Sequence, residues 1–361
     1  MQTVAFIIII TNTLLLLLLL FTNITTMAIT MKAAEIQEYG EPENLKIFDV
    51  EIPTPQENQV LVKVMAAGVN PYEAYIRSGV YAMKPPLPWR PGNDGAGIIE
   101  KLGKGAESKF KVGDRVWVGG TVTGTYAEFC VASIDNTHEL PDSISFGQGA
   151  SLFVPARTAY RGLFTRVSTK AGDTVLVHGG SGAVGVLAVQ LAVANGCKVV
   201  ATAGTEKGIE LLESLGAIGI NHKKENYQDD LKQHGPYNII LEMLANVNLN
   251  TDIDVLARRG YIVVIGNRGT IDGVNMRKLM QCEGNIVGLM RGEPWEDKAA
   301  IAGINGALFS GVLKPIVSLD TYSLSDAAKA QRDVIEKKNG SYGKIVLTIN
   351  ANNDTTTKTD L

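Results

Sequence analysis

The strongest constraint on the fold is a short segment in the middle of this 361-residue chain. Residues 175–185 read Val-Leu-Val-His-Gly-Gly-Ser-Gly-Ala-Val-Gly, so an apolar run enters the pattern G-x-G-x-x-G at Gly180, Gly182 and Gly185. The first glycine permits a tight turn, the second lets backbone N–H groups approach a pyrophosphate, and the third lets the next helix pack closely. Because the positive end of that helix faces the anion, the segment predicts a dinucleotide site rather than a glycine-rich turn without a ligand.

Strands and helical stretches alternate from about Ser151 onwards, which is the pattern of βαβ units in a parallel sheet. A helix that follows the glycines ends at Asn195-Gly196, a typical C-terminal stop. The predicted helices are 186–194, 206–215 and 324–337, and the predicted strands are 174–178, 198–203, 237–242, 260–265 and 344–349.

The chain from Lys32 to about Ala150 has a different pattern, with short strands broken by Gly and Pro and few helices. Residues 59–65, 112–118 and 124–132 are the predicted strands. A small and mostly antiparallel β domain therefore precedes the predicted parallel sheet.

The N-terminus departs from this globular pattern, because residues 1–31 contain no Lys, Arg, Asp or Glu and Val4 to Phe21 is almost entirely apolar. As a helix this run would measure about 27 Å, close to the roughly 30 Å of a bilayer core. Three interpretations stay open: a non-functional extension with the working start at Met27 or Met31, a membrane anchor, or a signal peptide cleaved after Ala28.

The charge balance and the cysteines exclude several classes of protein. Thirty-four Lys and Arg against 37 Asp and Glu give a net charge of −3, which makes nucleic acid an unlikely main partner. Cys130, Cys197 and Cys282 are odd in number and far apart, so they form neither a disulfide framework nor a clustered zinc site. A reducing compartment, the cytoplasm, suits them best.

The end of the second predicted strand indicates which dinucleotide binds. An NAD enzyme holds the ribose hydroxyls there with a carboxylate, whereas this chain reads Ala201-Thr202-Ala203-Gly204-Thr205. Without a carboxylate at this position, the additional phosphate group of NADP is not repelled, so NADP can bind. Lys207, His222 and Lys223 are the candidate partners of that phosphate, and each is alternatively a solvated surface residue.

Several longer segments carry a family resemblance: 68–79 (GVNPYEAYIRSG), 177–182 (VHGGSG), 202–206 (TAGTE) and 242–249 (EMLANVNL). They resemble the zinc-independent quinone oxidoreductases of the medium-chain dehydrogenase/reductase superfamily, the family that includes zeta-crystallin. The resemblance covers about residues 31–349. It implies NADPH, quinone substrates and a cytoplasmic homotetramer, with a homodimer as the smaller alternative.

The resemblance also implies an α/β fold, in which a Rossmann doubly wound parallel sheet joins a GroES-like β-barrel catalytic domain. We expect the apolar extension at 1–30, the catalytic domain at 31–150 and the NADPH-binding Rossmann domain at 151–304. Residues 305–350 are expected to return to the catalytic domain, and 351–361 to form a disordered polar tail.

Site residues follow from the resemblance position by position. Tyr75 matches the tyrosine beside the nicotinamide, and Gly204 and His222 match the adenosine-phosphate end. Two positions depart from the family, since Ala183 replaces a glycine and Arg291 falls where the family is apolar; the added methyl requires a negative φ. The full set of predicted cofactor residues is Tyr75, Gly180, Ser181, Gly182, Ala183, Val184, Gly185, Gly204, His222, Asn248, Ile265, Gly266, Asn267, Arg268, Leu289, Met290 and Arg291.

The reaction class follows from a missing zinc site. Where alcohol dehydrogenases of the superfamily place zinc ligands, this chain reads Pro91-Gly92-Asn93-Asp94 without a nearby cysteine, so no metal is predicted. A quinone or enone is already a conjugated electrophile and needs mainly orientation and hydrogen bonds. Asn70 and Tyr75 are the predicted donors; alternatively, Tyr75 only packs on the nicotinamide and Asn70 only caps a turn.

An NADPH-dependent quinone reductase is therefore the predicted function. The resemblance leaves open whether electrons move singly or as a hydride. The alternatives are an NADPH-dependent enone or 2-enoyl thioester reductase, which would share fold and cofactor, and a non-catalytic NADPH-binding protein of structural or RNA-binding type.

Overall fold

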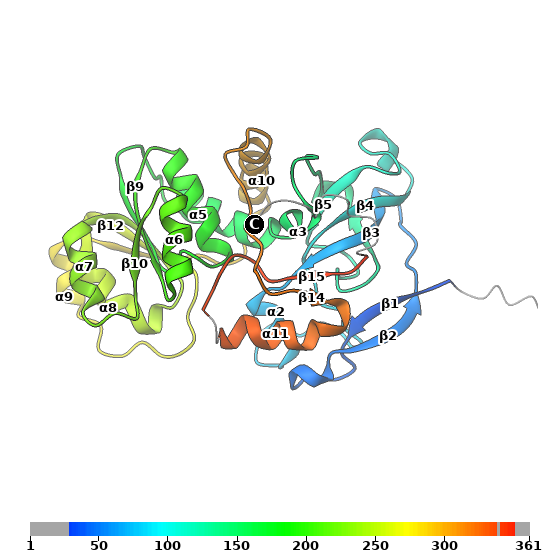
Figure 1. Cartoon of the computed structure of the whole chain (residues 1–361), viewed down its shortest axis with the longest axis horizontal. Helices are drawn as coiled ribbons and strands as arrows, with labels where there is room; N and C mark the ends of the chain where they lie inside the picture. Colours follow the sequence, from blue (N-terminus) through cyan, green and yellow to red (C-terminus); the bar gives the residue numbers. More distant parts are fainter. Residues whose placement is uncertain (1–28, 338–339, 351–361) are drawn as a thin grey trace, which may run out of the picture.

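Two large sheets organise the computed structural model, which describes residues 29–337 and 340–350 (Figure 1). One sheet is mostly antiparallel and the other is parallel, as the sequence predicts. The predictions for the apolar run Val4–Phe21 and for the tail 351–361 lie outside the described residues. Among the described helices, none combines the length and apolar character needed to cross a membrane.

The antiparallel sheet has seven strands in the order β14-β15-β3-β4-β5-β7, with β6 paired to β3, and a separate β1–β2 pair lies beside it. Within the sheet only β14 and β15 run parallel. The strands are β1 (Thr30–Glu35), β2 (Lys46–Glu51), β3 (Gln59–Gly68), β4 (Asp94–Leu102), β5 (Arg115–Gly119), β6 (Phe129–Ser133), β7 (Thr137–Glu139), β14 (Tyr322–Ser323) and β15 (Val346–Thr348).

The parallel sheet has six strands in the order β10-β9-β8-β11-β12-β13, which is the Rossmann order with β8 as its first strand. The order reverses between β8 and β11, and a ligand is expected at this switch point, beyond the carboxyl ends of the strands. The strands are β8 (Thr174–Val177), β9 (Lys198–Ala203), β10 (Ile218–Asn221), β11 (Tyr237–Glu242), β12 (Leu256–Val264) and β13 (Asn285–Gly288).

Helices cover both faces of the parallel sheet, because alternate side chains of each strand point to opposite sides. Val175 and Val177 enter one apolar core with α5 and α6, whereas Leu176 enters a second core with α7 and α8. The helices are α2 (Pro71–Arg77), α3 (Phe146–Gly149), α4 (Phe153–Tyr160), α5 (Ala183–Ala194), α6 (Glu206–Ser214), α7 (Tyr227–His234), α8 (Ala245–Val255), α9 (Met276–Gln281), α10 (Pro294–Phe309) and α11 (Ala327–Glu336).

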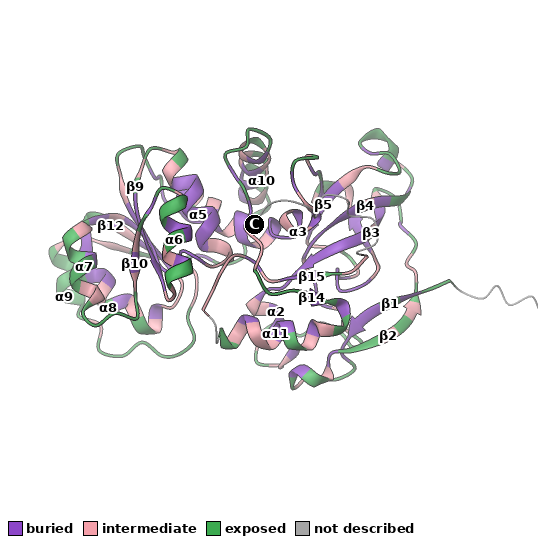
Figure 2. Ribbon diagram, in the orientation of Figure 1, coloured by how far each residue is buried: buried purple, intermediate pink, exposed green. Residues whose placement is uncertain are grey.

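The helix after the glycines, α5, is almost wholly buried (Figure 2). It is apolar on every side because it packs between the parallel sheet and α4. Its first residue is Ala183, three positions earlier than predicted, so the helix begins directly after Gly182.

The C-terminal segment returns to the antiparallel sheet, where β15 pairs with β3 through Leu347 and Ala67 (Figure 1). The helix before it, α11, is fixed to α2 by Arg77, whose Nε donates to Gln331 Oε1 at 2.9 Å. Strand β15 and helix α11 therefore lie against elements of the first 150 residues, while the domain limits, including 305–350, stay a prediction.

Several elements of the structure were not predicted from the sequence, and two strands and one helix are instructive examples. Strands β10 and β13 were not predicted, because each is only four residues long and lacks a clear apolar alternation. Helix α10 was also missed, although Pro294 at its first position and the Glu293–Glu296 capping box mark its start.

The closing strand gives a direct test of this architecture. Leu347 is completely buried, so Leu347→Ala is expected to lower the free energy of unfolding by about 2–5 kcal/mol. The neighbouring Thr348 is exposed, and Thr348→Ala should change it by less than about 0.5 kcal/mol. Urea denaturation measures both values, and equal stabilities of the two variants would show that β15 does not carry part of the core.

Candidate active site

A cavity of about 2600 Å³ lies between the two sheets and is lined by residues from both. Its parallel-sheet wall is formed by the start of α5 and by the segments that follow β12 and β13. Its other wall contains Asn70, Tyr72 and Tyr75 from the start of α2. The cavity thus lies at the switch point of the parallel sheet, where the glycine motif predicted a ligand.

The three motif glycines occupy the positions that their predicted roles require. A Cβ on Gly180 would lie 2.7 Å from the Cβ of Ala201, and one on Gly185 would lie 2.4 Å from the carbonyl oxygen of Gly179. Both contacts are too close for a side chain, so these glycines allow the turn and the helix to pack tightly. Gly182 is the N-cap residue of α5 and faces the cavity.

The start of α5 fits a pyrophosphate. Gly182, Ala183, Val184 and Gly185 line the cavity, and the free N–H groups of the first turn of this 12-residue helix lie there. Ala183 has helical dihedral angles, so the negative φ that its methyl group requires is met. Gly180 and Ser181 belong to the same loop but do not line the cavity.

Residues 340–344, here called the 340–344 segment, bind this loop from the other side. Ser181 Oγ donates to the carbonyl oxygen of Ser341 at 2.7 Å, and the N–H of Gly343 donates to the carbonyl oxygen of Ser181 at 2.8 Å. Gly182 and Gly343 also form a parallel bridge. The C-terminal return therefore holds the glycine loop directly.

Basic side chains lie near Gly204, the position without a carboxylate. A Cβ on Gly204 would lie 2.9 Å from His222 Nε2 and 3.2 Å from Lys223 Cε. Burial and the charges of His178, Lys223 and Lys337 lower the pKa of His222. Lys337 and Arg268 both line the cavity, whereas Lys207 is exposed on α6. Gly204 and His222 are not among the lining residues, so their contact with an additional phosphate group stays a prediction.

The other predicted cofactor residues divide into two groups. Ile265, Gly266, Asn267, Arg268, Leu289, Met290 and Arg291 line the cavity, as predicted for the rest of the dinucleotide. Asn248 is not among the lining residues; its Nδ2 donates to Glu242 Oε1 at 3.1 Å. Its predicted contact with the cofactor stays a prediction.

The two predicted donors have different surroundings. Tyr75 lies half-buried on α2 and lines the cavity. Asn70 is buried, caps α2, and its Nδ2 donates to Asp94 Oδ2 at 2.6 Å and to Glu73 Oε1 at 3.2 Å. Its Oδ1 accepts a hydrogen bond from Lys344 Nζ. All polar atoms of the Asn70 side chain thus bond to protein groups, which agrees with the alternative that Asn70 only caps a turn. Its role as a hydrogen-bond donor to the substrate stays a prediction.

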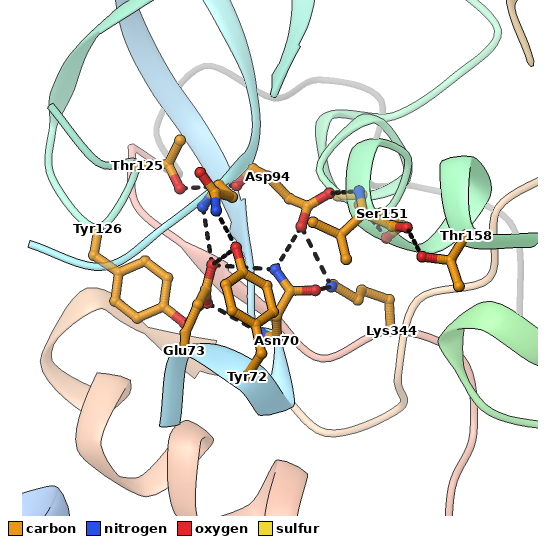
Figure 3. A network of polar contacts seen from close by, with 12 residues as sticks. Asn70, Tyr72, Glu73, Asp94, Thr125, Tyr126, Ser151, Thr158 and Lys344 are labelled. Atoms are coloured by element: carbon orange, nitrogen blue, oxygen red, sulfur yellow. Dashed lines mark hydrogen bonds and ion pairs between the residues drawn. The ribbon is translucent and has the colours of Figure 1, made fainter. Parts of the chain in front are cut away.

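Asn70 belongs to a buried polar network that sequence reasoning did not find (Figure 3). Lys344 Nζ lies 3.6 Å from Asp94 Oδ2, and both side chains are almost completely buried. The second oxygen of Asp94 accepts from the backbone N–H of Val154 at 2.8 Å. The one local signal was the capping pattern of Asn70 and Glu73, because Asp94 and Lys344 come from distant parts of the sequence.

Glu73 is the most densely bonded group of this network. Its carboxyl oxygens accept from the backbone N–H groups of Asn70 and Asn93 at 3.2 and 2.9 Å, and from Tyr126 Oη at 3.3 Å. Tyr72 Oη lies 3.5 Å from Glu73 Oε1. Burial raises the pKa of Glu73 to about 7, although the Lys344 charge and the hydrogen bonds favour the ionised form.

A second buried cluster, His178, Glu242 and Asp252, lies at the switch point behind the glycine loop. Their ligand-type atoms lie within 4.8 Å of one another, and within the described residues no other such group of three could hold a metal ion. His178 Nε2 lies 2.8 Å from Asp252 Oδ1, the distance of a hydrogen bond. Burial alone would lower the pKa of His178, but the Asp252 carboxylate more than offsets it and the net shift is upward. A hydrogen bond between the His178 imidazole and the Asp252 carboxylate therefore accounts for the 2.8 Å distance.

Comparisons with known proteins agree with the two-sheet architecture. Residues 56–142 match the family model of the alcohol dehydrogenase GroES-like domain, and residues 183–304 match that of zinc-binding dehydrogenases. The solved structure of Escherichia coli quinone oxidoreductase complexed with NADPH is similar, with a TM-score of 0.76 at 29% identity, over 88% of this chain and 99% of that one.

Curated relatives are similar over nearly their whole length. The quinone oxidoreductase of Homo sapiens is 43% identical over 88% of this chain and 97% of its own. That of Mus musculus is 44% identical with the same coverage. Identity at this level across both sheets shows that the chain belongs to the quinone oxidoreductase family of the medium-chain dehydrogenase/reductase superfamily.

Proposed function

We propose that this protein is an NADPH-dependent quinone reductase. The observation that carries the proposal is a single cavity that joins the glycine loop at the start of α5 to the tyrosines of α2. Relatives at 43% identity are named quinone oxidoreductase, and a similar solved structure is complexed with NADPH. An electron donor and an acceptor bound in this cavity would lie next to each other.

Residues on the parallel-sheet side would bind and orient the cofactor. The α5 N-terminus would hold the pyrophosphate through backbone N–H groups, while His222, Lys223 and Lys337 would face the additional phosphate. Segments 265–268 and 289–291 would extend along the remainder of the molecule. When bound, NADPH supplies a pair of electrons and a hydrogen from its nicotinamide ring.

Residues on the antiparallel-sheet side would bind the acceptor. The cavity wall here is apolar and aromatic, which suits a flat conjugated ring, and includes Val69, Val80, Tyr81, Met83 and Phe153. Tyr75 would donate a hydrogen bond to the acceptor oxygen that gains charge. Asn70 would act through position, because it fixes the start of the helix that carries Tyr75.

We further propose that no metal takes part in the reaction. The support is the side chain that stands where other members of the superfamily hold zinc. This side chain is Asp94, which forms an ion pair with Lys344 and accepts a hydrogen bond from Asn70. The Lys344 ammonium already supplies a positive charge to this buried site. A metal would have to displace it.

We also propose an assembly, a location and domain limits for this protein. An assembly of two or four copies is supported by the open edge of β13, where Ile286 is 37% exposed. The free thiols of Cys130, Cys197 and Cys282 support a reducing compartment such as the cytoplasm. We keep the domain limits at 31–150, 151–304 and 305–350.

The charges near Gly204 predict a preference for NADPH over NADH. We expect the Kd for NADPH to be at least about tenfold lower than the Kd for NADH. Lys223→Gln should reduce this preference by about fivefold, because one exposed charge pair contributes about 1 kcal/mol. Lys224→Gln is the matched control, since this neighbouring exposed lysine should leave the preference unchanged. Calorimetric titration measures each Kd, and equal affinities of the wild type for both cofactors would contradict the assignment of Gly204 and His222.

The role of Tyr75 is tested by removal of its hydroxyl group. Tyr75→Phe should lower turnover with a quinone by about tenfold or more, because a positioned donor contributes to the transition state. The Kd for NADPH should change by less than about twofold, since the ring is kept. Steady-state rates with quinone and with 2-enoyl thioester acceptors provide the measurement; unchanged turnover would leave Tyr75 a packing role only.

A further inference from the structure

A quinone gains negative charge when it is reduced, whichever way the electrons arrive. When a hydride moves, one NADPH and one quinone give NADP⁺ and a hydroquinone monoanion, which then takes a proton from solvent. When electrons move singly, one NADPH and two quinones give NADP⁺, one proton and two semiquinone anions. Because each reduced acceptor carries one negative charge after the transfer, a fixed positive charge beside it favours both routes.

Lys344 is located where the two walls of the cavity meet. One residue earlier, Gly343 forms the parallel bridge with Gly182 of the glycine loop. The Lys344 side chain extends to the opposite wall, where its Nζ donates to Asn70 Oδ1 at the start of α2 (Figure 3). Its backbone thus adjoins the cofactor side of the cavity, and its ammonium group adjoins the acceptor side.

The backbone and the side chain of Lys344 are both held in place. Its N–H donates to the carbonyl oxygen of Ile316 at 2.9 Å, and its own carbonyl oxygen accepts from the N–H of Ser318 at 2.7 Å. The side chain passes close to Gly68, where a Cβ would lie 2.9 Å from Lys344 Cε. A charge fixed in this way needs no rearrangement when an acceptor is reduced, and such preorganisation is what makes it effective.

The buried polar network presents its positive charge to the cavity. Lys344 lines the cavity, whereas Asp94 and Glu73 are not among the lining residues. All three side chains are buried, so water screens their charges little. Of these three residues, only Lys344 therefore borders the space in which an acceptor would bind.

Asp94 does not use up the hydrogen-bonding capacity of the ammonium group. Lys344 Nζ lies 3.6 Å from Asp94 Oδ2, which is beyond hydrogen-bond distance. Asp94 instead accepts from Asn70 Nδ2 at 2.6 Å and from the N–H of Val154 at 2.8 Å. An ammonium group has three N–H donors, and within the described residues only Asn70 accepts from Lys344 Nζ. Two donors are thus left for a group in the cavity.

The other Lys and Arg residues that line the cavity differ from Lys344 in one of two ways. Arg157 lies 2.9 Å from a carboxylate oxygen of Asp297. Arg161 lies equally close, at 2.9 Å, to Glu296. The rest are exposed, so solvent screens their charges: Lys109, Arg268, Arg291, Lys298, Lys329 and Lys337. Among the described residues of the cavity wall, Lys344 is the buried cation without a carboxylate within hydrogen-bond distance.

We propose that the Lys344 ammonium stabilises the negative charge that the acceptor gains during electron transfer. The proposal rests on the proposed quinone reductase function, and it holds for single-electron and hydride transfer alike. It assigns a task in the reaction to a lysine of the C-terminal return that the sequence did not single out.

The principal test removes the charge and keeps a long side chain. Lys344→Met should lower the single-turnover rate of quinone reduction by about tenfold or more, because the loss of a preorganised donor at the developing charge costs about a hundredfold or more. The Kd for NADPH should change by less than about threefold, since the effect belongs to the transition state. Stopped-flow absorbance of NADPH at saturating quinone measures the rate, and calorimetric titration measures the Kd.

Lys298→Met is the matched control for this test. Lys298 lines the same cavity but is exposed, so its charge is screened by solvent. Its single-turnover rate should stay within about twofold of the wild type. A rate as low as that of Lys344→Met would show that any cation of the cavity wall has the same effect, and this result would overturn the assignment to Lys344.

A double variant separates charge stabilisation from folding. Lys344→Met alone leaves the buried carboxylate of Asp94 without its counter-ion and should destabilise the fold. Lys344→Met combined with Asp94→Asn removes both charges, so urea denaturation should show part of the stability restored, and this variant carries the comparison if the single one does not fold. Its single-turnover rate should stay low, because the positive charge is still missing. Recovery of the wild-type rate would show that Lys344 only balances Asp94.

The choice of acceptor provides a readout that a purely structural role would not move. A quinone of lower reduction potential is harder to reduce, so more negative charge has developed on it in the transition state. The rate lost in Lys344→Met and in the double variant should therefore be larger for such quinones. A plot of the logarithm of the rate against reduction potential should become steeper than in the wild type. An equal loss across the series would indicate a displaced acceptor site and would contradict the proposal.

Failure of this proposal and failure of the proposed function give different results. A wild-type enzyme that reduces quinones at a rate that Lys344→Met retains would overturn the proposal alone. So would a Kd for NADPH that rises by about tenfold or more in Lys344→Met with an unchanged rate at saturating NADPH, because the charge would then serve the cofactor. If the wild type oxidises no NADPH in the presence of any quinone, the proposed function itself fails.

Discussion

A buried ion pair between Lys344 and Asp94 is the interaction on which the site depends. An ammonium group taken out of water is stable only with close partners, and here the carboxylate of Asp94 and the side-chain amide oxygen of Asn70 provide them. Asp94 begins β4, Asn70 is the N-cap residue of α2, and Lys344 lies two residues before β15. The same three residues therefore fix the helix that carries Tyr72 and Tyr75, which line the cavity.

Local sequence patterns were sufficient for much of the parallel sheet. The predicted strands 198–203 and 237–242 coincide with β9 and β11. Their side chains are buried on both faces of the sheet, so each strand is a continuous apolar run in the sequence, with glycines and polar residues at its ends. The glycine motif also located the cavity correctly, and at Gly180 and Gly185 the close packing leaves no room for any side chain. Both are properties of a few neighbouring residues.

The polar network could not be predicted in the same way, because its members meet only in the folded chain. Lys344 and Asn70 are 274 positions apart, and a single lysine before a strand has no signature of its own. The hydrogen bond between Tyr72 and Asn93 likewise depends on how β4 lies beside α2. Short edge elements such as β13 were missed for a related reason, since four residues do not establish a period.

The 340–344 segment links events that are usually considered apart. It hydrogen-bonds the glycine loop through Ser341 and Gly343, and its last residue, Lys344, lines the cavity and donates to Asn70 at the start of α2. Four residues of backbone, Ser341 to Lys344, thus connect the two opposite walls of the cavity. A substitution in the 340–344 segment should accordingly disturb both walls of the cavity together.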